Sequence, residues 1–227
     1  MIVLENVRKT YNDGKAAAFT ALKDVNLKIG DNELIAIVGN SGAGKSTLMH
    51  VLACIDTCED GTVTVDEQVI VPTDDKQCAG IRNKKFGIVL QDFALIPELT
   101  VLENIEIPLI FAGVKAKQRK EMCVKLLESV DMKDLQYKEV AKLSGGQKQR
   151  VAVCRAVVND PQYIFADEPT GSLDSEHAED IFEMLVNLHK QGKTVVLVTH
   201  NRDLAARCNR VITVFDGLIT EDTQKGK

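Results

Sequence analysis

The chain has 227 residues, of which 44% are apolar and 27% charged, and its net charge is −5. That length suits one large α/β domain, or a core domain with a smaller inserted lobe. The weakly acidic balance argues against loose binding of nucleic acid, which needs a basic surface, so we expect no nucleic-acid partner. Charged residues interrupt the first apolar residues and the longer apolar runs, which argues against a signal peptide and a membrane-spanning helix.

The first part of the chain contains the alternating or continuous apolar runs that are typical of strands. The first two runs are expected to form antiparallel edge structure, with Asp31-Asn32 as a tight turn before the third. A helix is expected from Gly44 to Cys54. The expected strands are 1–7, 18–29, 32–39, a pair within 61–71, and 86–91.

Residues from about 97 to 142 show a helical pattern instead. Thr100 and Glu103 have the spacing of a capping box, which predicts a helix to about Phe111. Residues 116–130 place apolar side chains on one face of a second helix, with charged residues between them. We therefore expect a helical subdomain at about 97–142, inserted in a core made of 1–96 and 143–220.

Beyond this lobe, helices and apolar strands alternate, which predicts a mostly parallel sheet covered on both faces. Asp216-Gly217 predicts a hairpin turn into 218–220, and residues 221–227 are expected to be a frayed tail. The expected elements are helix 144–158, strand 163–167, helix 176–190, strand 194–199, a short helix from Asn201, and strand 210–215.

The stretch GNSGAGKST matches the phosphate-binding pattern G-x-x-x-x-G-K-[ST], with a strand before it and a helix after it. Its glycines let backbone N–H groups point at phosphates, Lys45 reaches the β- and γ-phosphates, and Ser46 offers a hydroxyl to Mg²⁺. A glycine turn without a ligand is the alternative, which this context disfavours. Because the guanine-specificity motif N-K-x-D is absent, ATP is the expected nucleotide. Its expected contacts here are Gly39, Asn40, Ser41, Gly42, Ala43, Gly44, Lys45, Ser46 and Thr47.

Two carboxylates, Asp167 and Glu168, stand at the end of the apolar strand YIFAD. Open α/β sheets bind ligands at the carboxyl ends of their strands. Asp167 is therefore expected to hold Mg²⁺ through a water, and Glu168 to act as general base on an attacking water. A solvated strand end would be the better interpretation if the chain had no phosphate loop.

Three further polar side chains follow apolar strands. As a neutral imidazole, His200 is able to donate to the γ-phosphate and orient Glu168, and a structural histidine is an equal interpretation. Gln91 is able to contact Mg²⁺ or water, although a strand-end glutamine says little by itself. Tyr11 is able to stack on a base, although a single tyrosine more often packs in a half-buried position.

A second glycine-rich turn, Ser144, Gly145, Gly146 and Gln147, opens the helix that follows the lobe. The free N–H groups of a helix N-terminus attract anions. An ordinary capped helix is the simpler interpretation of Ser-Gly-Gly on its own.

Six cysteines in a chain without an export signal are expected to be reduced thiols. His50, Cys54 and Cys58 are spaced four residues apart, so a metal site on one helix face is one interpretation. The buried face of a helix packed on a sheet is favoured instead, because residues 56–61 signal a helix end near Cys58.

Together, LSGGQ, the phosphate loop, the Asp-Glu pair, the strand-end glutamine and the strand-end histidine resemble the nucleotide-binding subunits of ABC transporters. The resemblance covers essentially the whole chain, from Ile2 to about Thr220. It implies one ABC ATPase domain over 1–227: an α/β P-loop NTPase core with a mostly parallel sheet, an antiparallel β subdomain and the inserted helical subdomain. It also implies ATP and Mg²⁺ as cofactors.

The same resemblance assigns roles to single residues. It implies that Tyr11 stacks on adenine, that Gln91 belongs to the Q-loop, that Asp174 belongs to the D-loop, and that His200 is the H-loop switch. The family works as a head-to-tail homodimer. In that dimer the LSGGQ turn of one subunit closes over ATP held on the phosphate loop of the other.

The stretches QDFALIPELTVLENIEIPLIFAGV and ADEPTGSLDS further resemble the subgroup that serves lipoprotein-release, macrolide-export, antimicrobial-peptide-resistance and cell-division complexes. There the cassette is a separate subunit paired with a membrane protein. The resemblance implies a cytoplasmic protein, peripheral on the inner face of the cell membrane, that drives export or extraction of peptides, lipoproteins or drugs. Asn40, Asn201, Cys154 and the missing proline before Leu143 depart from the family pattern, and they blur the subgroup without removing a chemical group.

The transmembrane permease subunit is expected to dock near the Q-loop and the lobe. Phe93, Leu95, Ile96 and Leu99 form an apolar patch that suits a partner helix, and the lobe's own core is an equal interpretation. Two other functions stay open. One is a soluble or cell-division-type ABC ATPase that drives a non-transport conformational change. The other is a scaffold that binds ATP without hydrolysis, against which Glu168 and His200 argue.

Overall fold

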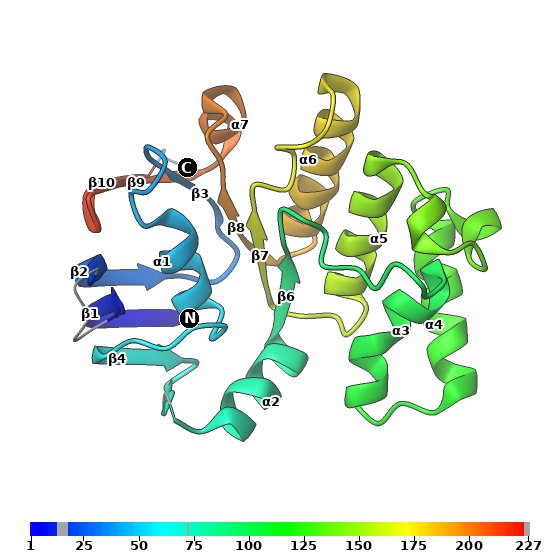
Figure 1. Cartoon of the computed structure of the whole chain (residues 1–227), viewed down its shortest axis with the longest axis horizontal. Coiled ribbons are helices and arrows are strands. Elements are labelled where there is room, and N and C mark those ends of the chain that lie inside the picture. The colour runs from blue at the N-terminus through cyan, green and yellow to red at the C-terminus, as the bar shows by residue number, and fades with distance from the viewer. Residues whose placement is uncertain (13–17, 72, 225–227) are drawn as a thin grey trace.

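The computed structural model describes residues 1–12, 18–71 and 73–224. It contains a four-stranded antiparallel sheet of order β2-β1-β4-β5 beside a six-stranded sheet of order β10-β9-β3-β8-β7-β6 (Figure 1). The predicted antiparallel pairing of the first two strands is confirmed, with Ile2 opposite Ile29. The antiparallel sheet consists of β1 (Ile2–Tyr11), β2 (Phe19–Ile29), β4 (Asp60–Val65) and β5 (Gln68–Val69).

The six-stranded sheet is parallel except for its edge strand β10. The predicted hairpin turn before β10 is confirmed, because Asp216 and Gly217 have the positive φ angles, 47° and 77°, that a type I′ turn requires. The neighbouring strands β6, β7 and β8 run in one direction, so their carboxyl ends share one edge. The strands are β3 (Leu34–Val38), β6 (Phe86–Val89), β7 (Tyr163–Asp167), β8 (Thr194–Val198), β9 (Arg210–Phe215) and β10 (Leu218–Gln224).

Alternate residues of the central strands face two different cores, as the two-residue period of a strand requires. On β3, Ile35 and Ile37 face a cluster that includes α1 and the inner side of the antiparallel sheet. Leu34 and Ala36 face a second cluster, which includes α5, α6 and α7. Helix α1 therefore lies between the two sheets, and the other three helices cover the opposite face (Figure 1). Their bounds are α1 (Lys45–Leu52), α5 (Gly145–Val157), α6 (Ser175–Lys190) and α7 (Arg202–Arg207).

A third apolar cluster joins α3 (Val101–Phe111), α4 (Ala116–Glu128) and one side of α5. The predicted capping box of α3 is confirmed: Glu103 N donates to Thr100 Oγ1 at 3.2 Å, and Thr100 N donates to Glu103 Oε2 at 2.8 Å. Short 3₁₀ turns follow at Lys133–Leu135 and Val140–Lys142.

Helix α5 contributes to two clusters at once. Ala152 and Val153 pack toward the sheet, whereas Val151 and Cys154 pack toward α3 and α4. We therefore propose that the lobe extends from about 97 to 142, as the sequence predicts. Helix α5 is the element that packs against both the lobe and the core.

Two details of the predicted fold were wrong. Helix α2 (Asp75–Lys85) was not predicted, because it buries only Cys78 and Ile81 and so has almost no apolar periodicity. Residues 221–224 are not a frayed tail but the end of β10, where Arg210 Nη2 binds Asp222 Oδ2 at 2.6 Å. Residues 225–227, the rest of the expected tail, lie outside the described residues.

The interpretation of the His50–Cys54–Cys58 spacing as one buried helix face is wrong. All six cysteines are buried. Helix α1 ends at Leu52, and Cys54 has a φ of 53°, so the three residues do not share one helix face. Within residues 1–12, 18–71 and 73–224, no group of three or more His, Cys, Asp or Glu side chains is placed to hold a metal, and no helix is long and apolar enough to cross a membrane.

Candidate nucleotide and metal site

The loop before α1 has the conformation that a phosphate-binding turn needs. Gly39, Gly42 and Gly44 have φ angles of 152°, 77° and 103°, which other residues rarely adopt. Side chains would not fit at Gly39 and Gly44 in any case, because a Cβ would overlap the carbonyl oxygens of Val214 and Ala21. No described side chain caps the start of α1. The first N–H groups of α1 are therefore free to bind an anion.

Lys45, the first residue of α1, keeps its ammonium group at the loop. Its Nζ donates to the carbonyl oxygen of Asn40 at 2.9 Å. No carboxylate stands in the first turn of α1 to neutralise it. The ammonium group is thus held beside the free N–H groups at the start of α1.

Two oxygen ligands for a cation meet where α1 faces the end of β7. Ser46 Oγ donates to Asp167 Oδ1 at 3.1 Å, and Asp167 is only 7% exposed. His50 Nε2 lies 3.8 Å from the other carboxylate oxygen. A hydroxyl and a single carboxylate suit Mg²⁺, which usually takes one or two protein carboxylates and completes its shell with phosphates and water. The donor set therefore fits Mg²⁺ bound together with a nucleotide.

Glu168, the residue after β7, is held in a strained backbone conformation. Its φ is 44°, in the left-handed region, and its N–H donates to the carbonyl oxygen of Val198 on β8 at 3.0 Å. Its carboxylate Oε2 lies 2.8 Å from Nδ1 of His200, which follows β8. The side chain of Glu168 is 14% exposed and that of His200 72%. Parallel pairing of β7 and β8 thus brings together two residues that the sequence places 32 positions apart.

Gln91 lies two residues beyond the end of β6, one strand further along the same sheet edge. Gly171 lies close to both Gln91 and Glu168. A Cβ atom added to Gly171 would lie 3.9 Å from Gln91 Nε2 and 3.7 Å from Glu168 Cβ. The amide of Gln91 therefore stands beside the turn that carries Glu168.

Tyr11 lies next to the start of α1. Its hydroxyl donates to Asp56 Oδ2 at 2.8 Å and is 3.5 Å from Thr47 Oγ1. Lys9 Nζ lies 5.1 Å from the ring centroid and binds Asp56 Oδ1 at 2.9 Å. Burial, and then the nearby Asp56, raises the pKa of the Tyr11 phenol. Sequence reasoning missed Lys9 and Asp56, because neither belongs to a recognisable motif.

The second glycine turn lies away from the phosphate loop of its own chain. Ser144 caps α5 with a complete capping box, in which Gln147 N donates to Ser144 Oγ at 3.3 Å. Figure 1 shows α5 and α1 on opposite sides of β6 and β7. The neighbours of the turn are Leu173 and His177, on either side of Asp174. The structure thus brings Tyr11, the loop, Ser46, Asp167, Glu168, His200 and Gln91 toward one sheet edge, and leaves the 144–147 turn elsewhere.

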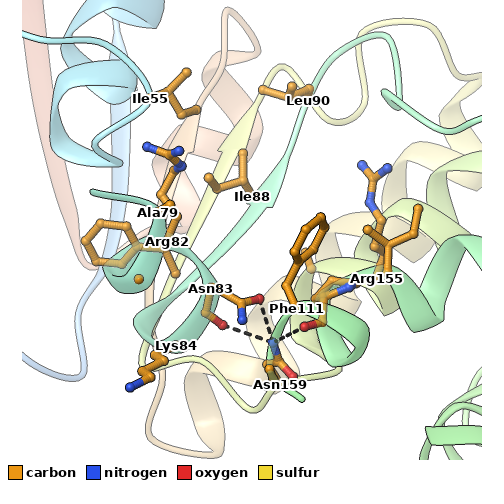
Figure 2. A pocket seen from close by; sticks show the side chains of 16 residues that line it. Ile55, Ala79, Arg82, Asn83, Lys84, Ile88, Leu90, Phe111, Arg155 and Asn159 are labelled. Atoms are coloured by element: carbon orange, nitrogen blue, oxygen red, sulfur yellow. Dashed lines mark hydrogen bonds between the residues drawn. The ribbon is translucent and has the colours of Figure 1, made fainter. Parts of the chain in front are cut away.

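An open groove separates α2 and β6 from the lobe, with a volume of about 780 Å³ (Figure 2). Asn159 links the two sides of the groove. Its Nδ2 donates to the carbonyl oxygen of Asn83 in α2 at 3.0 Å and to that of Pro108 in α3 at 3.2 Å. Phe111 on the lobe side is 80% exposed. Among the residues that the structure describes, the lining includes Arg82, Lys84 and Arg155 but no carboxylate.

The predicted docking patch is partly buried by the chain itself. Phe93 and Leu95 pack against the apolar clusters of the chain itself, whereas Ile96 is 43% exposed. Arg155 Nη2 donates to the carbonyl oxygen of Phe93 at 2.9 Å and so ties this segment to α5. The groove was not found from sequence, because its lining comes from segments far apart in the chain.

Comparison with known proteins identifies the family. The ABC transporter profile matches residues 22–171. An uncharacterized ABC transporter ATP-binding protein of Bacillus subtilis, YvrO, is 44% identical over 98% of this chain and 96% of its own length. The macrolide export ATP-binding/permease protein MacB of Aggregatibacter actinomycetemcomitans is 39% identical over 99% of this chain, which spans 35% of MacB.

Two solved dimers of the ABC transporter cassette MJ0796 match the whole chain at 40% identity, with TM-scores of 0.92 and 0.90. The second is a post-hydrolysis state bound to ADP and Pi. The chain therefore belongs to the ABC transporter family, as an ATP-binding cassette with ATPase activity.

Proposed function

We propose that this chain is the ATP-hydrolysing subunit of an ABC exporter, that it works as a head-to-tail homodimer, and that it couples hydrolysis to a separate membrane permease. The observation that carries the proposal is the Glu168–His200 pair, which stands at the same sheet edge as Ser46 and Asp167. A scaffold that only binds ATP has no use for a held carboxylate there.

In this proposal the phosphates of ATP lie on the N–H groups of residues 39–47, with Lys45 at the β- and γ-phosphates. Ser46, Asp167 and Gln91 would hold Mg²⁺, which neutralises phosphate charge when bound. Tyr11 stacks on the adenine. Its position beside Thr47 supports this, because Thr47 is in the first turn of α1.

Glu168 takes a proton from the attacking water, which is general-base catalysis. His200 positions it through the 2.8 Å contact between Nδ1 and Oε2. That contact places the N–H of a neutral ring on Nδ1 and leaves Nε2 as an acceptor. His200 is consequently able to donate to a phosphate oxygen from Nε2 only when the ring is protonated.

The 144–147 turn and Asp174 are proposed to contact the ATP of the second copy. The separation of α5 from α1 within one chain and the two MJ0796 dimers support this arrangement. Each ATP then contacts two chains, so it binds the closed dimer better than the open one. A difference in affinity of this kind is what allows a ligand to shift a conformational equilibrium.

The membrane subunit is proposed to dock in the groove between α2 and the lobe, with the cassette at the inner face of the membrane. The lining is apolar around Ile88, Leu90 and Phe111, and its charged members are cations. These features suit an apolar helix that carries an acidic side chain. The similarity to the macrolide export protein MacB favours export as the process that is driven. Drugs, peptides or lipoproteins are the proposed substrates.

The test is ATP hydrolysis and dimerisation of the purified chain, with and without Glu168→Gln. The proposal expects hydrolysis by the wild type, and a stable ATP-bound dimer without turnover from the variant. Normal turnover by Glu168→Gln would overturn it.

A further inference from the structure

The two glycines of the second turn are not explained by backbone freedom. Gly145 and Gly146 lie in the first turn of α5, and neither needs a positive φ. What differs between them is the neighbour that each one meets. A Cβ on Gly145 would make an ordinary 3.6 Å contact with Leu173 Cδ2. A Cβ on Gly146 would overlap the imidazole Cδ2 of His177 and lie 3.0 Å from its Cγ.

The imidazole of His177 is also bound to Asp174. Its Nδ1 lies 2.8 Å from both carboxylate oxygens of Asp174, and Asp174 Oδ1 accepts the backbone N–H of His177 at 3.0 Å. Asp174 in this way caps α6 and holds the His177 ring at the same time. The side chain of His177 therefore reaches from the Asp174 turn to the backbone of Gly146.

A second contact between α5 and α6 lies one helical turn further along. Arg150 of α5 binds Asp180 of α6 at 2.5 Å. The two helices are consequently joined at their starts by the ring of His177 and again by an ion pair. The segment before α6 is compact as well, because Gly171 N donates to Glu168 O at 3.0 Å and Leu173 N to Thr170 O at 3.2 Å.

We propose that His177 is a positioning residue that fastens the 144–147 turn to the Asp174 turn, so that both meet the second copy and its ATP as one rigid surface. This inference rests on the proposed head-to-tail dimer. Without the ring, the two turns would lose their direct link, and the Arg150–Asp180 ion pair would join the helices only one helical turn further along. Closing the dimer would then carry a larger conformational-entropy cost, because both turns would have to be ordered. The phosphate loop of the same chain would be unchanged.

The first experiment measures ATP-driven dimerisation by sedimentation in a Glu168→Gln background. His177→Ala is expected to raise the ATP concentration for half-maximal dimerisation by about fivefold, the low end of typical coupling between sites. Affinity of the monomer for a fluorescent ATP analogue is expected to stay the same. His177→Asn, whose amide is able to donate to Asp174, is expected to recover part of the loss. Equal ATP dependence of His177→Ala and its parent would overturn the proposal.

The second experiment tests the contact without any dimer, by thermal unfolding of the full chain. Alanine is a better helix former than glycine, so Gly145→Ala is expected to raise the unfolding temperature or leave it unchanged. With His177 present, the unfolding temperature of Gly146→Ala is expected to be lower than that of Gly145→Ala. In a His177→Ala background the two unfolding temperatures are expected to be equal. Equal melting in the native background would show that His177 does not fill the face of Gly146 and would overturn the inference. A Glu168→Gln parent that fails to dimerise would contradict the proposed function instead, and the melting comparison would still decide the contact.

Discussion

Nδ1 of His200 lies 2.8 Å from Oε2 of Glu168, and the two residues come from the ends of neighbouring parallel strands. Glu168 has a φ of 44° and is fixed by the N–H that it donates to Val198. Strain of this kind in a non-glycine residue costs about 1–3 kcal/mol and persists where the surroundings impose it. The backbone of Glu168 is thus fixed, and His200 orients its carboxylate.

The first prediction concerns this carboxylate. Glu168→Gln keeps the shape of the side chain and an acceptor for His200, but the amide cannot take a proton. Hydrolysis should fall by about 10²–10⁴-fold, the usual contribution of a general base. ATP affinity should be unchanged. Phosphate release and binding of a fluorescent ATP analogue measure the two quantities, and a parallel loss of both would contradict the assigned role.

The second prediction concerns Lys45. Replacing it by alanine removes the ammonium group that Asn40 holds at the loop. A hydrogen bond from a charged group contributes about 1.5–3 kcal/mol, so the Kd for ATP should rise about 10- to 100-fold. Lys142→Ala is the matched control, because Lys142 is a solvent-exposed lysine paired with Glu139. Similar ATP affinity in both variants would argue against the phosphate-loop assignment.

The third prediction concerns stability at acidic pH. Burial alone would raise the pKa of Asp66, but hydrogen bonds from Lys85, the N-terminal amine and Tyr163 lower it to about 2. A carboxyl whose pKa is lower in the folded chain than in the unfolded chain stabilises the fold above the unfolded pKa. That contribution is lost as pH falls through the folded pKa.

Asp66→Asn should therefore lower the free energy of unfolding at pH 7 by about 1 kcal/mol, discounted because the side chain is partly solvated. The difference should shrink between about pH 4 and pH 2. Asparagine tolerates the φ of 47° at this position, so the turn itself is preserved. Asp131→Asn is the control, an exposed aspartate with a φ of 55°. Urea titrations across this pH range decide, and a pH-independent difference would contradict the ion-pair explanation.

The fourth prediction concerns the groove. Phe111→Ser should weaken binding of the membrane subunit by about tenfold or more, since buried aromatic anchors commonly contribute 2 kcal/mol. Its unfolding temperature should change little, because Phe111 is 80% exposed. Phe19→Ser is the control, at an aromatic residue that is 51% exposed on β2, outside the groove. Co-purification with the membrane subunit measures the effect, and equal loss in both variants would argue against the groove.

Much of this arrangement could be predicted from the sequence, because its signals are local. The φ requirements of Gly39 and Gly44 and the apolar strands before Asp167 and His200 are visible in short windows. Helix α2 could not be predicted, because it buries only two side chains. The contact between the His177 ring and Gly146 also could not, since the two residues are 31 positions apart and meet only through the packing of α5 on α6.

The central claim is that each ATP site is built from two chains. Mixing Lys45→Ala protein with Ser144→Arg protein tests it most directly, because neither homodimer contains an intact site. The mixed dimer would contain one intact site and one doubly damaged site. The account predicts that ATP-dependent dimerisation and part of the hydrolysis return only on mixing. A mixture in which neither an ATP-dependent heterodimer nor hydrolysis appears would contradict it.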